Sequence, residues 1–300
     1  MRVAAVDLGT NTTRLLVADV VDGRIDELHR ETRITRLGEG VDARRRLLPV
    51  PIARVRNTLS DYRRTAEQLG AERVLAVATS AVRDAENGEA FLGEVEWSYG
   101  FTTQLASGEE EAQLTRRGVQ PQPGTLVLDI GGGSTELVVD DFHVSLPMGA
   151  VRFTERWGEH RAAIEEATTA LLAEHVDVHP GAAVGVAGTV TTLAALDLGL
   201  EEYDRERVDG HVLTRRAAQT QLYRLAALPL EERKQVPALE PERAPVIVAG
   251  ACILVATLAY FGLNAITVSE RDILDGIALA AAELPAPEEG AAPPGAFTCC

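Results

Sequence analysis

The sequence predicts an α/β fold built from two related domains that face one another. Segments with the apolar pattern of buried strands alternate with segments whose apolar residues recur at helical spacing. In addition, the segment 3–19 recurs at 125–141 without a gap. This period is too long for a solenoid repeat, so it indicates a duplicated domain.

Each copy of the repeat reads as an apolar strand, a carboxylate at the strand end, a turn rich in Gly, Ser and Thr, and a second apolar strand. The identical pairs are Asp7/Asp129, Gly9/Gly131, Thr13/Thr135, Leu15/Leu137, Val17/Val139 and Asp19/Asp141. One such turn alone is typical of an ordinary hairpin. Two copies in phase favour paired phosphate loops, because glycine permits close approach and turn amides can point at an anion.

The other elements follow from apolar spacing and from helix start and stop signals. The segment 51–69 has apolar residues at helical intervals, and Ser107-Gly-Glu-Glu110 fits a capping box that opens a helix. Further expected helices are 85–95, 164–175, one starting near 191 and one within 244–262. Further expected strands are 2–6, 73–78, 102–105, 182–187 and 265–268. Pro121-Gln-Pro-Gly124 separates the domains, which gives 1–120, 121–284 and a Pro/Ala/Gly/Glu-rich tail, 285–300, expected to be disordered.

Composition excludes several classes of protein. The chain of 300 residues carries a net charge of −16, most of it after residue 120, so a protein that coats nucleic acid is not expected. A polyanionic ligand would need a local basic site, and the arginine-bearing first half favours one. The only lysine, Lys234, precedes Gln235, which excludes a P-loop, and no G-x-G-x-x-G follows a strand.

The start of the chain and its cysteines predict a cytoplasmic protein. Residues 2–6 read as a strand rather than as the apolar region of a signal peptide, and the three cysteines form no disulfide framework or zinc motif. The uncharged stretch 244–269 has the length of a membrane span, but Pro245, Gly250, Gly262 and Asn264 interrupt it. It therefore favours a buried helix, a turn and a buried strand, with no membrane partner.

At this point the sequence resembles the exopolyphosphatase and guanosine-pentaphosphate phosphohydrolase family, within the actin, Hsp70 and sugar-kinase superfamily. The matching pieces occur in the family's order from residue 7 to about 280: Asp7-Leu-Gly-Thr-Asn-Thr-Thr-Arg14, Ala78-Thr-Ser-Ala-Val-Arg83, Ser107-Gly-Glu-Glu-Glu-Ala112, Asp129-Ile-Gly-Gly-Gly-Ser-Thr-Glu136, Pro147-Met-Gly-Ala-Val151, Gly188-Thr189 and Asp275-Gly276. The resemblance implies two actin-like (ribonuclease H-like) domains with a cleft between them. Departures at Gln113, Asp209, Asp272 and Leu274 affect the family's pattern but not the loops or carboxylates.

The resemblance implies hydrolysis of terminal phosphoanhydride bonds, which needs an aimed water and groups that hold phosphate charge. It assigns water activation to Glu111, whereas Glu109 and Glu110 favour a helix N-terminus. The expected phosphate-binding residues are Thr10, Asn11, Thr12, Arg14, Arg83, Gly131, Gly132, Gly133 and Ser134. The expected partners of Mg²⁺ (or Mn²⁺) are Asp129, Glu136 and, in the first copy, Asp7, for which a strand-end turn former is the stronger interpretation.

Several alternatives stay open. The favoured reaction is release of phosphate from inorganic polyphosphate; the nearest alternative substrate is guanosine pentaphosphate. A kinase of the same fold and a non-catalytic sensor of polyphosphate or the alarmone are further classes. A homodimer is an expectation from the resemblance alone. The basic run Arg44-Arg45-Arg46 could guide a polyanion, although a solvated loop is the simpler interpretation.

Overall fold

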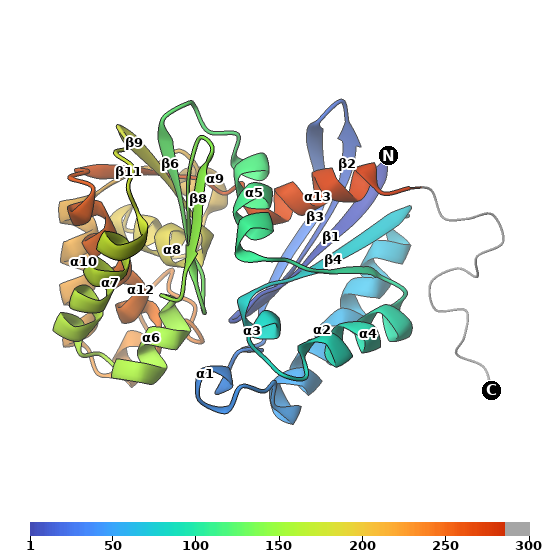
Figure 1. Ribbon diagram of the computed structural model, residues 1–300, viewed down its shortest axis with the longest axis horizontal. Coiled ribbons are helices and arrows are strands. Elements are labelled where there is room, and N and C mark those ends of the chain that lie inside the picture. Colours follow the sequence, from blue (N-terminus) through green and yellow to red (C-terminus); the bar gives the residue numbers. More distant parts are fainter. Residues whose placement is uncertain (286–300) are drawn as a thin grey trace. The chain divides into compact units, whose positions relative to one another are not determined.

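The structure, a computed structural model, describes residues 1–285 and divides the chain into two compact units (Figure 1). Of the described residues, unit 1 comprises 1–118 and 273–285, and unit 2 comprises Val119–Asp272. The sequence-based boundaries differ from this division chiefly in the last helix, which they assigned to the second domain. The expectation for the tail falls, from residue 286 onward, outside the described residues.

Unit 1 contains a five-stranded sheet in the order β3-β2-β1-β4-β5, in which β1 pairs antiparallel with β2 and parallel with β4. Its strands are β1 (Arg2–Leu8), β2 (Thr12–Val21), β3 (Arg24–Ile34), β4 (Arg73–Ala78) and β5 (Thr102–Leu105). Its helices are α1 (Val41–Arg44), α2 (Pro49–Gln68), α3 (Ser80–Arg83), α4 (Gly88–Tyr99), α5 (Gly108–Val119) and α13 (Ile273–Glu283).

Apolar residues of β1 point alternately to the two faces of this sheet, and each face is covered. Ala4, Val6 and Leu8 pack with the apolar faces of α2 and α4. Val3 and Ala5 pack with α13 on the opposite face (Figure 1). This second face explains why α13 belongs to unit 1: without that helix, a fully apolar sheet surface would lie open to water.

Unit 2 repeats this plan. Its sheet has the order β10-β11-β9-β6-β7-β8, so that a three-stranded antiparallel meander again leads into parallel strands. The strands are β6 (Thr125–Ile130), β7 (Thr135–Val139), β8 (Phe142–Leu146), β9 (Ala182–Val186), β10 (Val212–Thr214) and β11 (Ala265–Val268). The helices are α6 (Ala150–Trp157), α7 (Arg161–His175), α8 (Ala187–Asp197), α9 (Arg205–Val208), α10 (Arg215–Ala227), α11 (Leu230–Arg233) and α12 (Ile247–Tyr260).

The turns of the two repeats close with the same hydrogen bond. The amide of Gly9 donates to the carbonyl of Thr12 at 2.9 Å, and the amide of Gly131 donates to the carbonyl of Ser134 at 3.0 Å. The α/β fold with two related sheets predicted from the repeat is therefore confirmed. The strands expected at 73–78, 102–105 and 265–268 are β4, β5 and β11, with the same limits.

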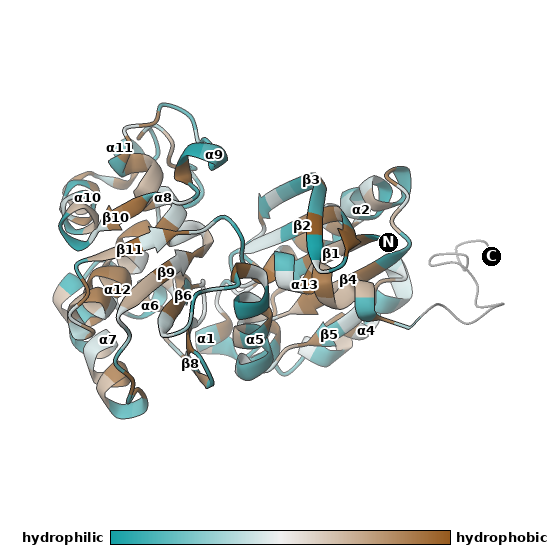
Figure 2. Ribbon diagram, turned by 90° about the horizontal axis from the view of Figure 1, so that it is seen from above, coloured by the Kyte–Doolittle hydropathy of each residue, from teal (hydrophilic) through white to brown (hydrophobic). Residues whose placement is uncertain are grey.

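The uncharged stretch 244–269 forms the buried helix α12 and the strand β11 (Figure 2). Across residues 1–285, no helix combines the length and the apolar character that crossing a bilayer requires. The helix expected near residue 191 begins earlier, at Ala187, directly after β9.

Gly276 of α13 is a sensitive point of this packing. A Cβ at this position would lie 1.9 Å from the carbonyl oxygen of Leu114 in α5. We therefore expect Gly276→Ala to lower the free energy of unfolding by about 1–3 kcal/mol, because the helix must move away from its neighbour. Thermal unfolding followed by circular dichroism measures this change.

Gly93 provides the matched control. It also lies within a helix, α4, but a Cβ there meets nothing within 4 Å. Gly93→Ala should raise stability by up to about 1 kcal/mol, because alanine has the higher helix propensity. Equal effects of the two substitutions would contradict the role assigned to Gly276.

Candidate functional site

The expected site residues of unit 1 lie at one edge of its sheet. Leu8 of β1 is in register with Ala78 of β4, and Ala78 is in register with Leu105 of β5. Because these strands are parallel, the segments that follow them leave the sheet at the same edge. That edge carries the turn 9–11, Arg83 at the end of α3, and Glu111 in the first turn of α5.

Glu111 is distinguished from its neighbours by burial and by its contact. Its relative exposure is 7%, whereas Glu109 and Glu110 are exposed. Nη1 of Arg83 donates to Oε2 of Glu111 at 3.2 Å and to the carbonyl of Ala106 at 2.8 Å. Two residues singled out separately in the sequence therefore meet, and a positive charge faces the buried carboxylate.

Glu110 has a structural task. The amide of Ser107 donates to Oε2 of Glu110 at 2.7 Å, and the amide of Glu110 donates to Oγ of Ser107 at 3.2 Å. This reciprocal pair is the expected capping box. The Ser107 amide also holds the pKa of the Glu110 carboxyl below its ordinary value. Glu110 thus fixes the start of the helix that presents Glu111.

Asp7 and Arg14 neutralise one another. They are cross-strand partners in the β1–β2 register, and Nε of Arg14 donates to Oδ2 of Asp7 at 2.8 Å. Both side chains are largely buried, with 5% exposure for Asp7 and 15% for Arg14. This buried pair weakens the case for Asp7 as a metal ligand and for Arg14 as a phosphate clamp, since each would have to leave its partner.

The turn between these strands has unused hydrogen-bonding groups. In the described part of the chain, the amides of Thr10 and Asn11 donate to no acceptor, and Oδ1 of Asn11 is a buried oxygen without a partner. The carbonyls of both residues are occupied by the segment 35–38. An unsatisfied buried polar atom is costly, so this turn is suited to a polar ligand.

In the glycine loop of unit 2, as in the turn 9–11, the carbonyls accept hydrogen bonds while some of the amides have no acceptor among the described residues. The carbonyls of Gly131 and Gly132 accept hydrogen bonds from the first amides of α6, and Nε of Arg152 donates to the carbonyl of Gly133 at 2.6 Å. The amides of Gly132, Gly133 and Ser134 have no acceptor among the described residues. A loop whose carbonyls are engaged and whose amides are available can bind an anion.

Close packing holds this loop in place. A Cβ at Gly149 would lie 2.3 Å from the carbonyl oxygen of Gly132. The glycine therefore lets the start of α6 approach the loop and bond its carbonyls. The piece Pro147-Met-Gly-Ala-Val151, noted in the sequence only as part of a resemblance, supports the glycine loop.

Asp129 and Glu136 occupy the positions of Asp7 and Arg14 in the second repeat. They are cross-strand partners in the β6–β7 register, with exposures of 6% and 1%. Oγ of Ser145, on the next strand, donates to Oε1 of Glu136 at 2.8 Å. Directly opposed residues project from the same face of a sheet, so two buried carboxylates are placed side by side, an arrangement that favours a cation.

This pair fits a magnesium ion. No cluster of three or more metal-ligating side chains occurs among residues 1–285. Mg²⁺, however, is usually held by one or two carboxylates while water and substrate phosphates complete its shell. Asp129 and Glu136 have the carboxylate chemistry of such a donor set, and the corresponding pair in unit 1 combines Asp7 with Arg14.

Sequence reasoning missed other polar groups at the same edge of the unit 2 sheet. Asp129 is in register with Val186, and Val268 with Gly185, so the starts of α8 and of the segment 269–272 join the glycine loop there. The guanidinium of Arg243 lies against Gly188, where a Cβ would come within 1.6 Å of Nη1. Gly188 provided a signal in the sequence, but nothing there indicated its arginine partner.

Glu270 is a carboxylate of that segment with a shifted pKa. It accepts hydrogen bonds from the hydroxyl of Tyr203 and from Nε of Arg205 at 3.1 Å. Burial raises the pKa of its carboxyl, which the hydrogen bond from Tyr203 partly counteracts. The Glu270 side chain is thus engaged within unit 2 and serves to fix the segment after β11.

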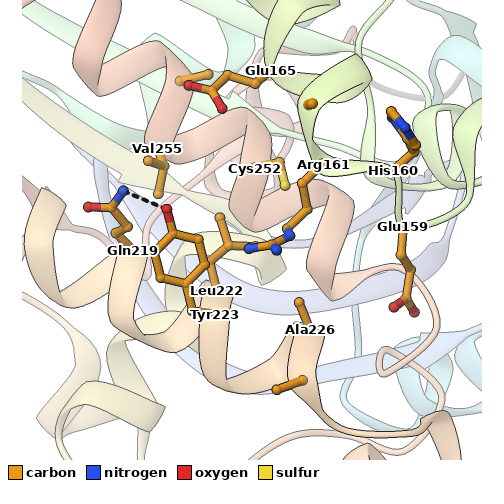
Figure 3. A pocket seen from close by; sticks show the side chains of 13 residues that line it. Glu159, His160, Arg161, Glu165, Gln219, Leu222, Tyr223, Ala226, Cys252 and Val255 are labelled. Atoms are coloured by element: carbon orange, nitrogen blue, oxygen red, sulfur yellow. Dashed lines mark hydrogen bonds between the residues drawn. The ribbon is translucent and has the colours of Figure 1, made fainter.

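A separate pocket in unit 2, of about 770 Å³, lies between α7, α10 and α12 (Figure 3). Arg161 lies over the ring of Tyr223 at 5.0 Å, and Nε2 of Gln219 donates to the Tyr223 hydroxyl at 3.1 Å. Cys252 is also part of its lining. None of the site residues expected from the sequence lines this pocket, so it is distinct from the candidate site.

Cys252 should be unreactive despite lying beside this pocket. Its relative exposure is 4%, and burial raises the pKa of its thiol to about 12. The thiol therefore stays protonated at pH 8, and the reactive thiolate forms only as the pH approaches that value. In a Cys299→Ser, Cys300→Ser background, iodoacetamide at pH 8 should leave Cys252 unmodified in the native protein and alkylate it in urea, as measured by mass spectrometry; modification of the native protein would contradict the assignment.

Comparison with known proteins agrees with this architecture. The chain matches the model of the Ppx/GppA phosphatase family over residues 16–283. It is 38% identical over 315 aligned positions to Exopolyphosphatase 2 of Mycobacterium tuberculosis, a match that covers 94% of this chain and 98% of that protein.

Solved structures give the same result. The Ppx/GppA family member of Aquifex aeolicus superposes with a TM-score of 0.79 at 32% identity, covering 93% of this chain and 97% of that one. An exopolyphosphatase from Cytophaga hutchinsonii superposes with a TM-score of 0.84 at 26% identity, covering 92% and 96%. The resemblance inferred from the motifs is confirmed, and the chain belongs to the Ppx/GppA phosphatase family.

Proposed function

We propose that this protein is an exopolyphosphatase, which releases phosphate from the end of inorganic polyphosphate by in-line attack of water. The observation that carries the proposal is the contact between Arg83 and the buried Glu111, at the sheet edge that also holds the turn 9–11. The 38% identity to Exopolyphosphatase 2 of M. tuberculosis supports this choice of substrate.

In this mechanism Glu111 accepts a proton from water, or orients it, as the oxygen attacks phosphorus. The capping box fixes the carboxylate along the helix, and Arg83 fixes it from the side. Burial restricts other water around Glu111. Arg83 keeps further N–H groups that can bind phosphate oxygens, since its fork carries five donors.

Each unit also has its own candidate phosphate-binding residues. In unit 1 the amides of Thr10 and Asn11 donate to phosphate oxygens, with the Thr12 hydroxyl beside them. In unit 2 the amides of Gly132, Gly133 and Ser134 do so, and their orientation is set before substrate binds because α6 occupies the carbonyls. Asp129 and Glu136 would hold Mg²⁺, which would neutralise charge on the phosphate oxygens.

Glu111→Gln tests the assigned base. We expect kcat for phosphate release from polyphosphate to fall by about 10²–10⁴, because the amide cannot accept the proton while the contact with Arg83 is largely kept. Glu109→Gln is the matched control: it removes an exposed carboxylate from the same helical turn and should leave kcat unchanged. An active Glu111→Gln enzyme would remove Glu111 from the mechanism.

The same assay distinguishes substrates. Wild-type protein is given tripolyphosphate, long-chain polyphosphate or guanosine pentaphosphate, each with Mg²⁺. Faster turnover of polyphosphate supports the proposal. Selective turnover of the nucleotide would transfer the same chemistry to guanosine pentaphosphate, and tight binding of either without turnover would indicate a sensor.

Glu136→Gln tests the cation site. We expect the Mg²⁺ concentration that gives half-maximal activity to rise at least about tenfold, because one of two carboxylate ligands is lost. Asp141→Asn, which removes an exposed carboxylate from the same hairpin, should leave it unchanged. Direct titration with Mn²⁺, followed by electron paramagnetic resonance, gives a readout independent of turnover; equal Mn²⁺ affinity in both variants would contradict the assignment.

A further inference from the structure

Three consecutive arginines of unit 1, Arg44, Arg45 and Arg46, are exposed and form no ion pair with any residue of the described range 1–285. Elsewhere in unit 1, exposed or half-buried arginines such as Arg33, Arg56 and Arg63 are paired with carboxylates. Three neighbouring positive charges repel one another. Such a cluster without carboxylate partners, in a chain with a net charge of −16, favours an anionic ligand.

The segment that carries these arginines is fastened to the turn 9–11 at its start. The carbonyl of Asn11 accepts hydrogen bonds from the amides of Thr35 and Arg36, at 3.0 and 2.9 Å, and the carbonyl of Thr10 accepts one from Gly38 at 2.9 Å. A Cβ at Gly38 would lie 2.3 Å from Cγ2 of Thr10. The chain leading into α1 therefore presses directly on the turn.

Its far end is fastened to the segment that follows Arg83. The amide of Glu86 donates to the carbonyl of Arg45 at 2.8 Å. The side chain of Asn87 bonds both backbone groups of Leu47, accepting from its amide at 2.8 Å and donating to its carbonyl at 3.1 Å. The three arginines are thus held between the two parts of unit 1 that the proposed function assigns to phosphate binding.

The backbone at Arg45 is also fixed in an unusual conformation. Its φ is +53°, in the left-handed region that favours glycine, and it ends the single turn of α1. The Glu86 amide holds this geometry by bonding the Arg45 carbonyl. Since Arg44 lies only six residues beyond Gly38, its Cα is at most about 20 Å from the turn.

We infer that Arg44, Arg45 and Arg46 bind phosphate groups of polyphosphate that lie beyond the terminal one. The inference rests on the proposed function and specifies its substrate. Polyphosphate carries negative charge along its whole length, and guanidinium groups suit phosphate oxygens. Only a chain long enough to reach both the turn 9–11 and the arginines would gain from this subsite, so we expect it to favour long-chain polyphosphate over tripolyphosphate and guanosine pentaphosphate.

The test compares two triple variants. Arg44→Ser, Arg45→Ser, Arg46→Ser removes the proposed subsite. Arg24→Ser, Arg207→Ser, Arg216→Ser removes the same charge from exposed arginines that likewise have no ion pair within the described part of the chain. Each is assayed with tripolyphosphate and with long-chain polyphosphate at low and at physiological salt. A lysine triple variant at 44–46 tests whether charge alone restores binding.

We expect the serine variant at 44–46 to raise KM for long-chain polyphosphate about tenfold at low salt, because three exposed ion pairs of modest strength are lost together. Its kcat, and both constants for tripolyphosphate, should stay at wild-type values, which also shows that the variant folds. The salt dependence of KM for the long chain should become shallower, since fewer phosphate charges are neutralised. The lysine variant should recover most of the loss, and the control variant should match wild type.

Equal KM changes in the two serine triple variants, or equal changes for both chain lengths, would overturn the inference while leaving the exopolyphosphatase assignment intact. If wild-type protein hydrolyses neither chain, the proposed function fails. Calorimetric titration with long-chain polyphosphate then decides the inference separately: weaker binding by the variant at 44–46 than by the control supports it, and equal binding refutes it.

Discussion

The structure depends on how a buried carboxylate at the end of a central strand is compensated. Both repeats place an aspartate there, Asp7 or Asp129, almost fully removed from water. A buried charge is costly unless a partner of opposite sign lies close by. In unit 1 the cross-strand partner is Arg14, whose positive charge compensates the buried Asp7 carboxylate. In unit 2 the cross-strand residue is Glu136, so two buried carboxylates lie side by side there.

The residue opposite the aspartate, Arg14 or Glu136, is the difference that separates the proposed roles of the two repeats. Their backbones are alike, as the matching turn hydrogen bonds between Gly9 and Thr12 and between Gly131 and Ser134 show. The position opposite the aspartate decides the chemistry. An arginine makes the first hairpin a rigid, neutral support for a turn whose amides are available. Under the proposed function, a glutamate makes the second hairpin a candidate donor of two oxygens to a hard metal ion, next to a loop whose amides are available to phosphate.

Much of this was predictable from the sequence, because the signals are local. Strands β4 and β11 follow from apolar runs between turns, and the capping box of Ser107 and Glu110 follows from residue spacing. What escaped prediction depends on contacts distant in sequence. The meeting of Arg83 with Glu111 requires that β4 and β5 be parallel neighbours, and the return of α13 to unit 1 requires knowing that the sheet has a second apolar face. The packing of Arg243 on Gly188 likewise joins segments that no motif connects.

The supports of the site explain why its glycines and caps occur where they do. A phosphate loop needs amides that are available and fixed, two demands that conflict unless the other backbone groups are bonded elsewhere. In unit 2 the start of α6 meets both demands by bonding the loop carbonyls, and Gly149 permits the approach. In unit 1 the segment 35–38 does the same for Thr10 and Asn11, with Gly38 in the equivalent role. The two units thus reach the same arrangement with unrelated segments, one a helix start and the other an extended chain. The constraint that both satisfy is therefore the orientation of the loop amides rather than any particular supporting element.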